Sequence, residues 1–336
     1  NKFSIEARQL IWKGGVVKNA VEIQNLKKDL SQLNYESNEL NIKLLSAGYY
    51  LDLFKLYNQE KVYHKNIELA QERLDNINKF YKQGMVTRND VIRGELQLSN
   101  LKLALQVVQN NQSILNKQLT VALGLDEGVK IIPDESIVTE SLEILPLASY
   151  YGDLVNHPTI KQTEKAVDIY AVSEKISRSD MMPSLSAFAG NTLQRPITTS
   201  NPAMDMYTNG WSAGLSLNFN IDALFKAPKK IQLNRLEKEK AIRQSNEVSE
   251  MMKVAVNAAH IKYNEALTQN NTLKVNKDLT AENYRIMESK YNNQLAILLD
   301  LIDASNAKLD AELQFANSEI NIVFAYYKLL KEAGTL

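Results

Sequence analysis

Two aspartates, Asp300 and Asp303, interrupt the apolar residues of the stretch KYNNQLAILLDLIDAS, which covers residues 290–305. They are three positions apart, so on a helix the two carboxylates lie on the same face. Carboxylates held close together attract cations. Taken alone, two acids on a helix are most often part of a solvated face, so a special role for the pair needs further support.

Few other side chains in the sequence could do chemistry. The chain of 336 residues has no cysteine, which excludes disulfides, thiolate zinc sites and cysteine nucleophiles. Its three histidines, His64, His157 and His260, are far apart and form no paired metal motif, so we interpret them as structural or exposed. No nucleophile and base pair, phosphate loop or metal cluster is visible, so we expect neither an enzyme nor a cofactor. The net charge is zero without a basic block, which argues against nucleic acid as a partner.

The distribution of proline and glycine indicates which elements carry the two aspartates. All seven prolines lie between Pro133 and Pro228, and the segment from Lys229 to Ala333 contains neither proline nor glycine. Long helices are therefore expected on both sides of an interrupted middle. Gly84, in the stretch FYKQGMVTRNDVIRGE, is expected to lie in a turn between two of these helices.

The two helical arms align without a gap when the sequence is shifted by 210 residues. Chance alone supplies several identities in such an alignment, so only their positions are informative. The identities lie on both sides of the turn in each arm, and the last of them is a glycine at the end of each arm. They include Tyr81 with Tyr291, Asp90 with Asp300 and Gly124 with Gly334. Each copy is predicted to contain a short strand, a helix of about 60 residues, a turn and a return helix of about 40. The longer helix would span about 90 Å, which exceeds any compact globular core.

The last helix is predicted to have one apolar and one polar face. Its apolar residues recur in alternating steps of three and four, as in the seam of a coiled coil. They are Leu295, Leu298, Ile302, Leu309, Leu313, Ala316, Ile320, Val323, Tyr327 and Leu330. A second stripe is almost wholly polar and comprises Asp300, Asp303, Ala307, Asp310, Gln314, Asn317 and Asn321. One face is therefore expected to pack and the other to meet water.

Residues from Trp211 to Ile221 alternate strictly between apolar and polar side chains, which predicts a strand. A strand of about eleven residues matches a tilted transmembrane strand, in which one set of side chains faces lipid. The lipid-facing residues would be Trp211, Leu215, Leu217 and Phe219. The alternative is a half-buried strand of a soluble sheet. No window approaches the roughly 18 consecutive apolar residues of a spanning helix, so contact with a bilayer would be through strands.

Two further segments favour the membrane alternative. The same alternation occurs in Phe3, Ile5 and Ala7, and Trp12 ends that segment as Trp211 begins the other. Tryptophans at strand ends suit the interface of a membrane. Residues 183–190 form a third candidate strand, and residues 191–210 are expected to be an exposed loop between two strands.

The sequence resembles the TolC-like outer-membrane efflux channels of Gram-negative bacteria over nearly its whole length. The matching stretches are QLIWKGG, YKQGMVTRNDVI, HPTI followed by MPSL, WSAGLSLNFNI, and the closing ALGL and EAGTL. No one of these is specific by itself, and the resemblance rests on their order and spacing. It implies a mainly α fold with a small β part. Long antiparallel coiled-coil hairpins would form an α-barrel tunnel, and transmembrane strands would complete a twelve-stranded β-barrel in a homotrimer.

The resemblance divides the chain into two repeats. Residues 1–132 would form the first repeat, with its turn near residue 84 and its leading helix and strand expected before Asn1. Residues 133–157 would be a linker at the equator of the tunnel. Residues 158–336 would form the second repeat, with a helix, a strand, the loop 191–210, a strand, a long helix, a turn near residue 294 and a return helix. The second copy has DALFKAP in place of the Gly14 and Gly15 bend, and Pro228 is expected in the first turn of its long helix.

By this resemblance the protein is the outer-membrane exit duct of a tripartite efflux pump or a type I secretion system. Such a duct is passive, because an RND or ABC transporter in the inner membrane supplies the energy. A periplasmic adaptor, or membrane fusion protein, would grip the helical turns at the tip, which match Gly84, Thr87, Gln294 and Ile297. The alternative from another class is a soluble periplasmic coiled-coil scaffold or adaptor, which predicts no alternating strands.

The resemblance also implies roles for four residues near these turns. Asp300 and Asp303 match paired aspartates that form an acidic ring at the tunnel entrance when three protomers meet. Tyr291 and Asp90 match a tyrosine and an acid on neighbouring hairpins whose bond holds the entrance shut. The alternative is that Tyr291 is a packed residue of the helical seam. The family's basic partner in this latch matches Ala296, so that contact is missing here.

Overall fold

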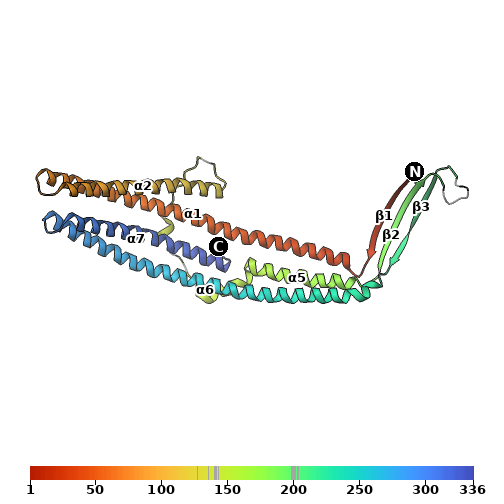
Figure 1. The fold of residues 1–336 in the computed structure, drawn as a ribbon. Coiled ribbons are helices and arrows are strands. Elements are labelled where there is room, and N and C mark those ends of the chain that lie inside the picture. Colours follow the sequence, from red (N-terminus) through yellow and green to blue (C-terminus); the bar gives the residue numbers. More distant parts are fainter. Residues whose placement is uncertain (127, 135, 140–141, 143, 198–201, 203) are drawn as a thin grey trace. The chain divides into compact units, whose positions relative to one another are not determined.

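The computed structural model describes residues 1–336 except 127, 135, 140–141, 143, 198–201 and 203. The elements in chain order are β1 (Lys2–Trp12), α1 (Val16–Lys82), α2 (Arg88–Ala122), α3 (Ser136–Thr139), α4 (Leu147–Asp153), a 3-10 helix (Leu154–Asn156), α5 (Pro158–Ser179), β2 (Ser184–Gln194), β3 (Thr208–Asn218), α6 (Asp222–Asn292) and α7 (Leu298–Ala333) (Figure 1). The expected mainly helical fold with a small antiparallel sheet is confirmed. Over the part of the chain that is described, no helix combines the length and apolar character needed to span a bilayer.

The chain forms two compact units. The strand unit comprises residues 1–37 and 155–251, and the hairpin unit comprises residues 38–154 and 252–336. The long helices α1 and α6 each contribute to both units. They contain 67 and 71 residues, and the return helices α2 and α7 contain 35 and 36, so the outgoing helices are longer than expected and the return helices shorter.

The strand unit contains an antiparallel sheet in the order β1-β2-β3. Its register pairs Ile5 with Asn191 and Asn191 with Trp211, so residues from all three strands share one face. The ladder between β2 and β3 continues to the pair Gln194 and Thr208. The connection is therefore residues 195–207, shorter than the expected loop 191–210, because the strands keep pairing beyond the point where their residues become polar.

The start of α6 differs from the expectation. The helix begins at Asp222, and Pro228 lies inside it. The amides of Ala223 and Leu224 bond to carbonyls preceding the helix, so the first turn has formed before the proline is reached. Pro228 has no amide proton and lacks the bond to the Leu224 carbonyl that other residues make at this position.

The bend between β1 and α1 is formed as the Gly14 and Gly15 pair predicts. Both residues have positive φ, 53° and 80°. The Ser179 hydroxyl donates to the Gly14 carbonyl over 2.5 Å, and a Cβ at position 14 would lie 2.9 Å from the Met182 side chain. Next to it, Asp180 accepts from Lys230 over 2.7 Å, so α5 is tied to both neighbouring segments at its C-terminal end.

The helices of the hairpin unit form a layer with α2 and α6 at its edges and α1 and α7 between them (Figure 1). The core cluster nearest the turns takes residues from all four helices, including Ile77, Val91, Tyr284 and Leu301. Hydrogen bonds between neighbours in the layer join Gln112 to Glu60 (α2 and α1, 2.8 Å), Asn66 to Glu312 (α1 and α7, 3.1 Å) and Asn270 to Ser318 (α6 and α7, 2.9 Å).

The apolar seam predicted for α7 is only partly correct. Leu298, Ile320 and Val323 are buried as expected, but Leu295 lies in the turn and is 77% exposed. The prediction missed Leu301, Ala304 and Ala311, which are buried. A helix in the middle of a layer is covered by more than one neighbour, so its buried surface is wider than the single seam of a two-stranded coiled coil.

The histidines take structural or surface positions. His157 is buried at the N-terminus of α5, where its Nδ1 accepts from the Thr159 amide over 3.1 Å, so the stretch HPTI does begin a helix. His64 lies 3.7 Å from Glu60, and His260 lies 3.3 Å from Asn264. The expected linker 133–157 contains the short helices α3 and α4 and the 3-10 helix.

Candidate functional site

The turn between α1 and α2 closes the end of a long helix with backbone bonds alone. The Met85 amide donates to the Phe80 carbonyl over 2.9 Å, and the Gly84 amide donates to the Tyr81 carbonyl over 3.0 Å. Gly84 has a φ of 74°, the left-handed conformation that ends many helices. These bonds form a Schellman motif, as the position of Gly84 in the sequence suggested.

The turn between α6 and α7 repeats the same motif 210 positions later. The Leu295 amide donates to the Lys290 carbonyl over 2.8 Å, and the Gln294 amide donates to the Tyr291 carbonyl over 2.9 Å. Gln294 has a φ of 62° and is the single residue other than glycine with positive φ among those that the structure describes. The position that glycine fills in the first turn is therefore strained in the second.

Replacing Gln294 with glycine is expected to stabilise the hairpin unit by about 0.5 to 1 kcal/mol, because the relief of left-handed strain exceeds the entropy lost by glycine on folding. The reverse change in the first turn, Gly84→Gln, is expected to destabilise it. Urea unfolding of the purified protein, followed by circular dichroism, measures both. Equal and opposite shifts would support the equivalence of the turns, and a loss of stability in Gln294→Gly would contradict it.

An aspartate next to each turn accepts hydrogen bonds at the N-terminus of the return helix. Asp90 accepts from the Thr87 amide over 2.8 Å and from the Thr87 hydroxyl over 2.7 Å, and its own amide donates to that hydroxyl over 3.3 Å. This is a capping box. At α7 the Ile297 amide donates to Asp300 over 3.4 Å, but the isoleucine has no side-chain oxygen to complete the box. The Thr-x-x-Asp spacing of residues 87–90 is a sequence signal that would have identified this role.

Asp300 and Asp303 lie on the exposed side of α7. Both carboxylates are exposed, as is Asp310 further along the same stripe. Leu301 and Ala304, which directly follow the two aspartates, are buried. The structure therefore places the two aspartates on one solvent-facing surface at the first turns of the helix. Asp300 also faces the positive N-terminal end of the helix dipole.

Tyr291 is packed into the core near the turns. Tyr291 is 8% exposed, and the centre of its ring lies 6.5 Å from that of the Phe80 ring in an edge-to-face arrangement. The hydroxyl is buried and has no hydrogen-bond partner among the residues that the structure describes. Burial raises the pKa of Tyr291, the nearby charge of Asp90 raises it further, and the charge of Arg73 lowers it.

Tyr291 and Asp90 line one pocket of about 280 Å³ between the two turns. Its wall also includes Thr87, Gln294 and Ile297. The structure thus brings together both residues of the expected latch, although Asp90 is engaged with Thr87 rather than with the tyrosine. The turn residues Gly84, Thr87, Gln294 and Ile297 are exposed, as docking would require.

A buried arginine links the four helices below this pocket. Arg73 of α1 is 8% exposed and donates to Gln97 of α2 over 2.8 Å, to the Tyr284 hydroxyl of α6 over 3.0 Å and to Ser305 of α7 over 3.2 Å. The Tyr284 hydroxyl in turn donates to Glu288 over 2.7 Å. The sequence carried no signal for this arrangement, because Arg73 is a single arginine without a counterpart in the second copy.

The strand residues expected to face lipid are exposed to solvent in the isolated chain. Trp211 is 82% exposed, and Leu215, Leu217 and Phe219 are exposed as well. Phe219 lies one residue beyond the end of β3, because the strand covers residues 208–218 rather than 211–221. On the opposite edge Phe3 and Ile5 are also exposed, so the apolar face extends across the sheet.

Comparison with known proteins gives a consistent assignment. The sequence profile of the family described as "Outer membrane efflux protein" matches residues 150–335. The outer membrane efflux protein BepC of Brucella suis is 19% identical over 338 residues, covering 99% of this chain and 72% of that protein.

Solved structures of similar fold include the outer membrane protein VceC of Vibrio cholerae, at a TM-score of 0.82 and 15% identity, covering 99% of this chain and 79% of that one. Another is the CmeC outer membrane channel of Campylobacter jejuni, at a TM-score of 0.79 and 14% identity, covering 100% and 77%. The resemblance drawn from the sequence is confirmed. The chain belongs to the outer membrane efflux protein family, and the protein is located in the outer membrane.

Proposed function

We propose that the protein assembles as three copies into a passive exit duct of a tripartite efflux pump or a type I secretion system. The observation that carries this proposal is that both units leave apolar surface uncovered in a single chain. In the strand unit it is one face of the sheet, and in the hairpin unit it is the outer side of the two edge helices. Each surface calls for a different covering, lipid in one case and a second copy of the chain in the other.

The sheet fits a lipid-facing wall. Ile5 and Trp211, on its two outer strands, are 81% and 82% exposed. Both β1 and β3 are edge strands, whose unpaired amides and carbonyls cost several kcal/mol each in hydrocarbon. We therefore infer that the sheets of neighbouring copies pair along these edges and close into a barrel. The matching turns at Gly84 and Gln294 support two repeats, residues 1–132 and 158–336, joined by residues 133–157.

The edge helix α2 has two apolar faces. Its buried face includes Val91, Leu98 and Leu101, which pack in the core. On the opposite side, by the rotation of 100° per residue, runs an exposed stripe. The stripe consists of Ile92, Leu96, Leu103, Val107, Ile114 and Val121. A helix that is apolar on two sides is normally covered on both.

The edge helix α6 repeats this arrangement in the hairpin unit. Val256, Tyr263 and Tyr284 are buried on one side, and the opposite side carries the exposed stripe Val254, Ile261, Val275, Leu279 and Ile286. If α2 of one copy packs against α6 of the next, the two surfaces in contact are different. Such an interface joins copies head to tail and closes a ring when the rotation allows it.

The turns would form the periplasmic entrance of this tunnel. Three copies bring six carboxylates, from Asp300 and Asp303, around one opening and concentrate cations there. Tyr291 and Asp90 would act as the latch, since release of Asp90 from Thr87 would allow its carboxylate to accept from the tyrosine. The exposed Gly84, Thr87, Gln294 and Ile297 would meet a periplasmic adaptor, and an RND or ABC transporter in the inner membrane would supply the energy.

An aspartate in the α2 stripe is expected to weaken the assembly. Leu103→Asp would place an unpaired charge in each interface between copies, at a cost of several kcal/mol per interface. Light scattering of the detergent-solubilised full-length protein should therefore show trimers before the change and mainly monomers after it. Ser113→Asp adds the same charge to an exposed position outside the stripe and should leave the trimer intact. A monomeric unmodified protein would disprove the proposed assembly.

A further inference from the structure

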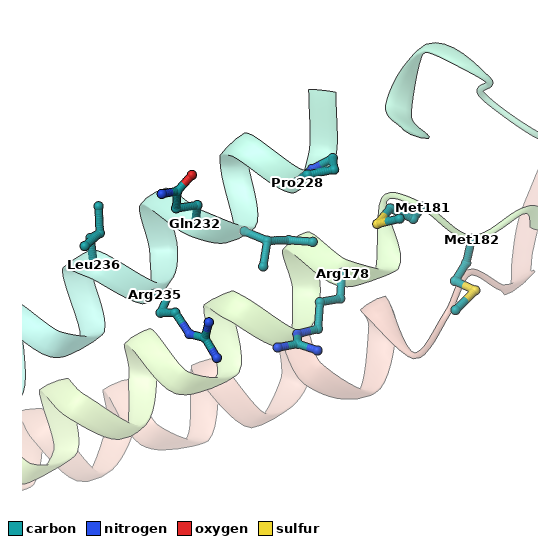
Figure 2. Close-up of a pocket in the computed structure, with 8 residues that line it drawn as sticks. Arg178, Met181, Met182, Pro228, Gln232, Arg235 and Leu236 are labelled. Atoms are coloured by element: carbon teal, nitrogen blue, oxygen red, sulfur yellow. The ribbon is translucent and has the colours of Figure 1, made fainter. Parts of the chain in front are cut away.

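A pocket of about 850 Å³ lies in the strand unit between the C-terminal end of α5 and the first turns of α6 (Figure 2). Two arginines line it, Arg178 from α5 and Arg235 from α6, and the lining contains no acidic side chain. The remaining wall is mostly apolar and consists of Met181, Met182, Pro228, Ile231, Leu236 and the polar Gln232. The pocket therefore combines positive charge with an apolar surface, which fits an anionic amphiphile.

Arg178 is held in position by a buried acid of its own helix. Arg178 donates to Glu174 over 2.7 Å, and Glu174 is 9% exposed. The hydrogen bond from Arg178 lowers the pKa of Glu174, and the charges of Arg178, Lys238 and Arg235 lower it further, against the effect of burial. Glu174 thus pairs directly with Arg178, and the charge of Arg235 also acts on it.

The apolar wall of the pocket continues toward the sheet. Leu224, Pro228, Ile231 and Arg235 are spaced as i, i+4, i+7 and i+11, so they lie on one face of α6. Leu224 is exposed at the start of that face, and its neighbour Phe225 is 76% exposed. The helix begins only four residues after β3 ends at Asn218, so the first residues of this face are close along the chain to the strand whose apolar side chains are exposed. Arginine side chains are long enough to reach toward a polar boundary while their stems pack on apolar surface.

We propose that this pocket binds the phosphate headgroup of an anionic glycerophospholipid in the periplasmic leaflet of the outer membrane. The inference rests on the proposed function, because it requires the sheet to lie in the bilayer. The two guanidinium groups would donate to the phosphate oxygens, for which the planar fork of arginine is well suited. The acyl chains would lie along the exposed side chains of Leu224 and Phe225. A free phosphate ion could use the arginines but would gain nothing from the apolar wall.

The test compares lipid retention by the full-length channel and two charge-matched variants, using native mass spectrometry in detergent. The first variant carries Arg178→Gln and Arg235→Gln. The second carries Lys240→Gln and Arg243→Gln, which remove the same charge from exposed positions of α6 outside the pocket. The probes are phosphatidylglycerol, phosphatidylcholine and glycerol 3-phosphate. Phosphatidylglycerol should bind the first variant about tenfold or more weakly, since two charge-assisted contacts are lost, and should bind the second variant as it binds the parent.

Three results would overturn the site. The first is that both variants retain phosphatidylglycerol equally well. The second is that the parent binds phosphatidylcholine as tightly as phosphatidylglycerol. The third is that glycerol 3-phosphate displaces phosphatidylglycerol from the parent at equal concentration. Arg178→Lys with Arg235→Lys keeps the charge but not the fork, and it should bind with intermediate affinity. Conductance in planar bilayers separates the two proposals. A parent protein that does not conduct contradicts the channel, whereas conducting variants that all retain the lipid contradict only the lipid site.

Discussion

A channel carrying both Asp300→Asn and Asp303→Asn is expected to lose most of its preference for cations. The two carboxylates lie on one exposed face at the start of α7, and three copies would place six of them around one opening. Clustered charges of this kind raise the local concentration of counter-ions by about tenfold or more, so the cation-to-anion permeability ratio should fall by a similar factor. Reversal potentials across a salt gradient in planar bilayers give this ratio. Block by trivalent cations should disappear in the same variant.

Asparagine is preferred to alanine here because Asp300 also accepts from the Ile297 amide, and the asparagine oxygen can keep that bond. Asp278→Asn removes one charge from an exposed position of α6 outside the polar stripe of α7 and should leave the permeability ratio unchanged. The effect should shrink in 1 M salt, where the screening length is about 3 Å. If the double variant behaves as the parent in low salt, the two aspartates are part of an ordinary solvated helix surface.

Arg73→Met is expected to lower the free energy of unfolding of the hairpin unit by about 3 kcal/mol or more. The change removes a buried cation that donates three hydrogen bonds, and it leaves Gln97, Tyr284 and Ser305 without this donor. Hydrogen bonds to charged groups contribute about 1.5 to 3 kcal/mol each, and the partners left behind carry a further desolvation cost. Urea unfolding followed by circular dichroism measures the loss.

The matched control is Arg285→Met on α6. Arg285 bonds Glu282 over 2.7 and 2.9 Å, but the pair is exposed and solvent screens it, so no measurable change is expected. Arg73→Lys keeps the charge and loses the forked geometry, so its stability should lie between those of the parent and Arg73→Met. Equal stability of the Arg73→Met and Arg285→Met proteins would show that the buried network does not hold the four helices together.

Features that depend on local sequence were predictable. The Gly84 turn and its equivalent at Gln294 followed from one glycine and a constant shift of 210 residues, and the strands followed from strict alternation. These patterns reflect backbone sterics and side-chain periodicity, which act over a few residues. The exposed face of the two aspartates followed in the same way from their spacing on the helix.

Features that depend on distant residues were not predictable. Leu301 and Ala304 are buried because α7 is covered by neighbours on more than one side, and the sequence of one helix does not contain that information. Arg73 takes its partners from three other helices, at positions up to 232 residues away. The helical start ahead of Pro228 was missed because a proline near the beginning of a helix is usually in its first turn.

The two faces of β3 differ in bulk as well as in polarity. Between Gly210 and Ser216 the polar face presents only glycine and serine, and the apolar face over the same span presents Trp211, Ala213 and Leu215. Opposite Gly214 the ring of Phe188 occupies the space that a Cβ would need, at 3.1 Å. When a sheet curls, side chains on the concave side are brought closer and those on the convex side move apart. The small residues of β3 thus set the direction in which this part of the sheet can bend with least crowding, before any further strand is added to its edge.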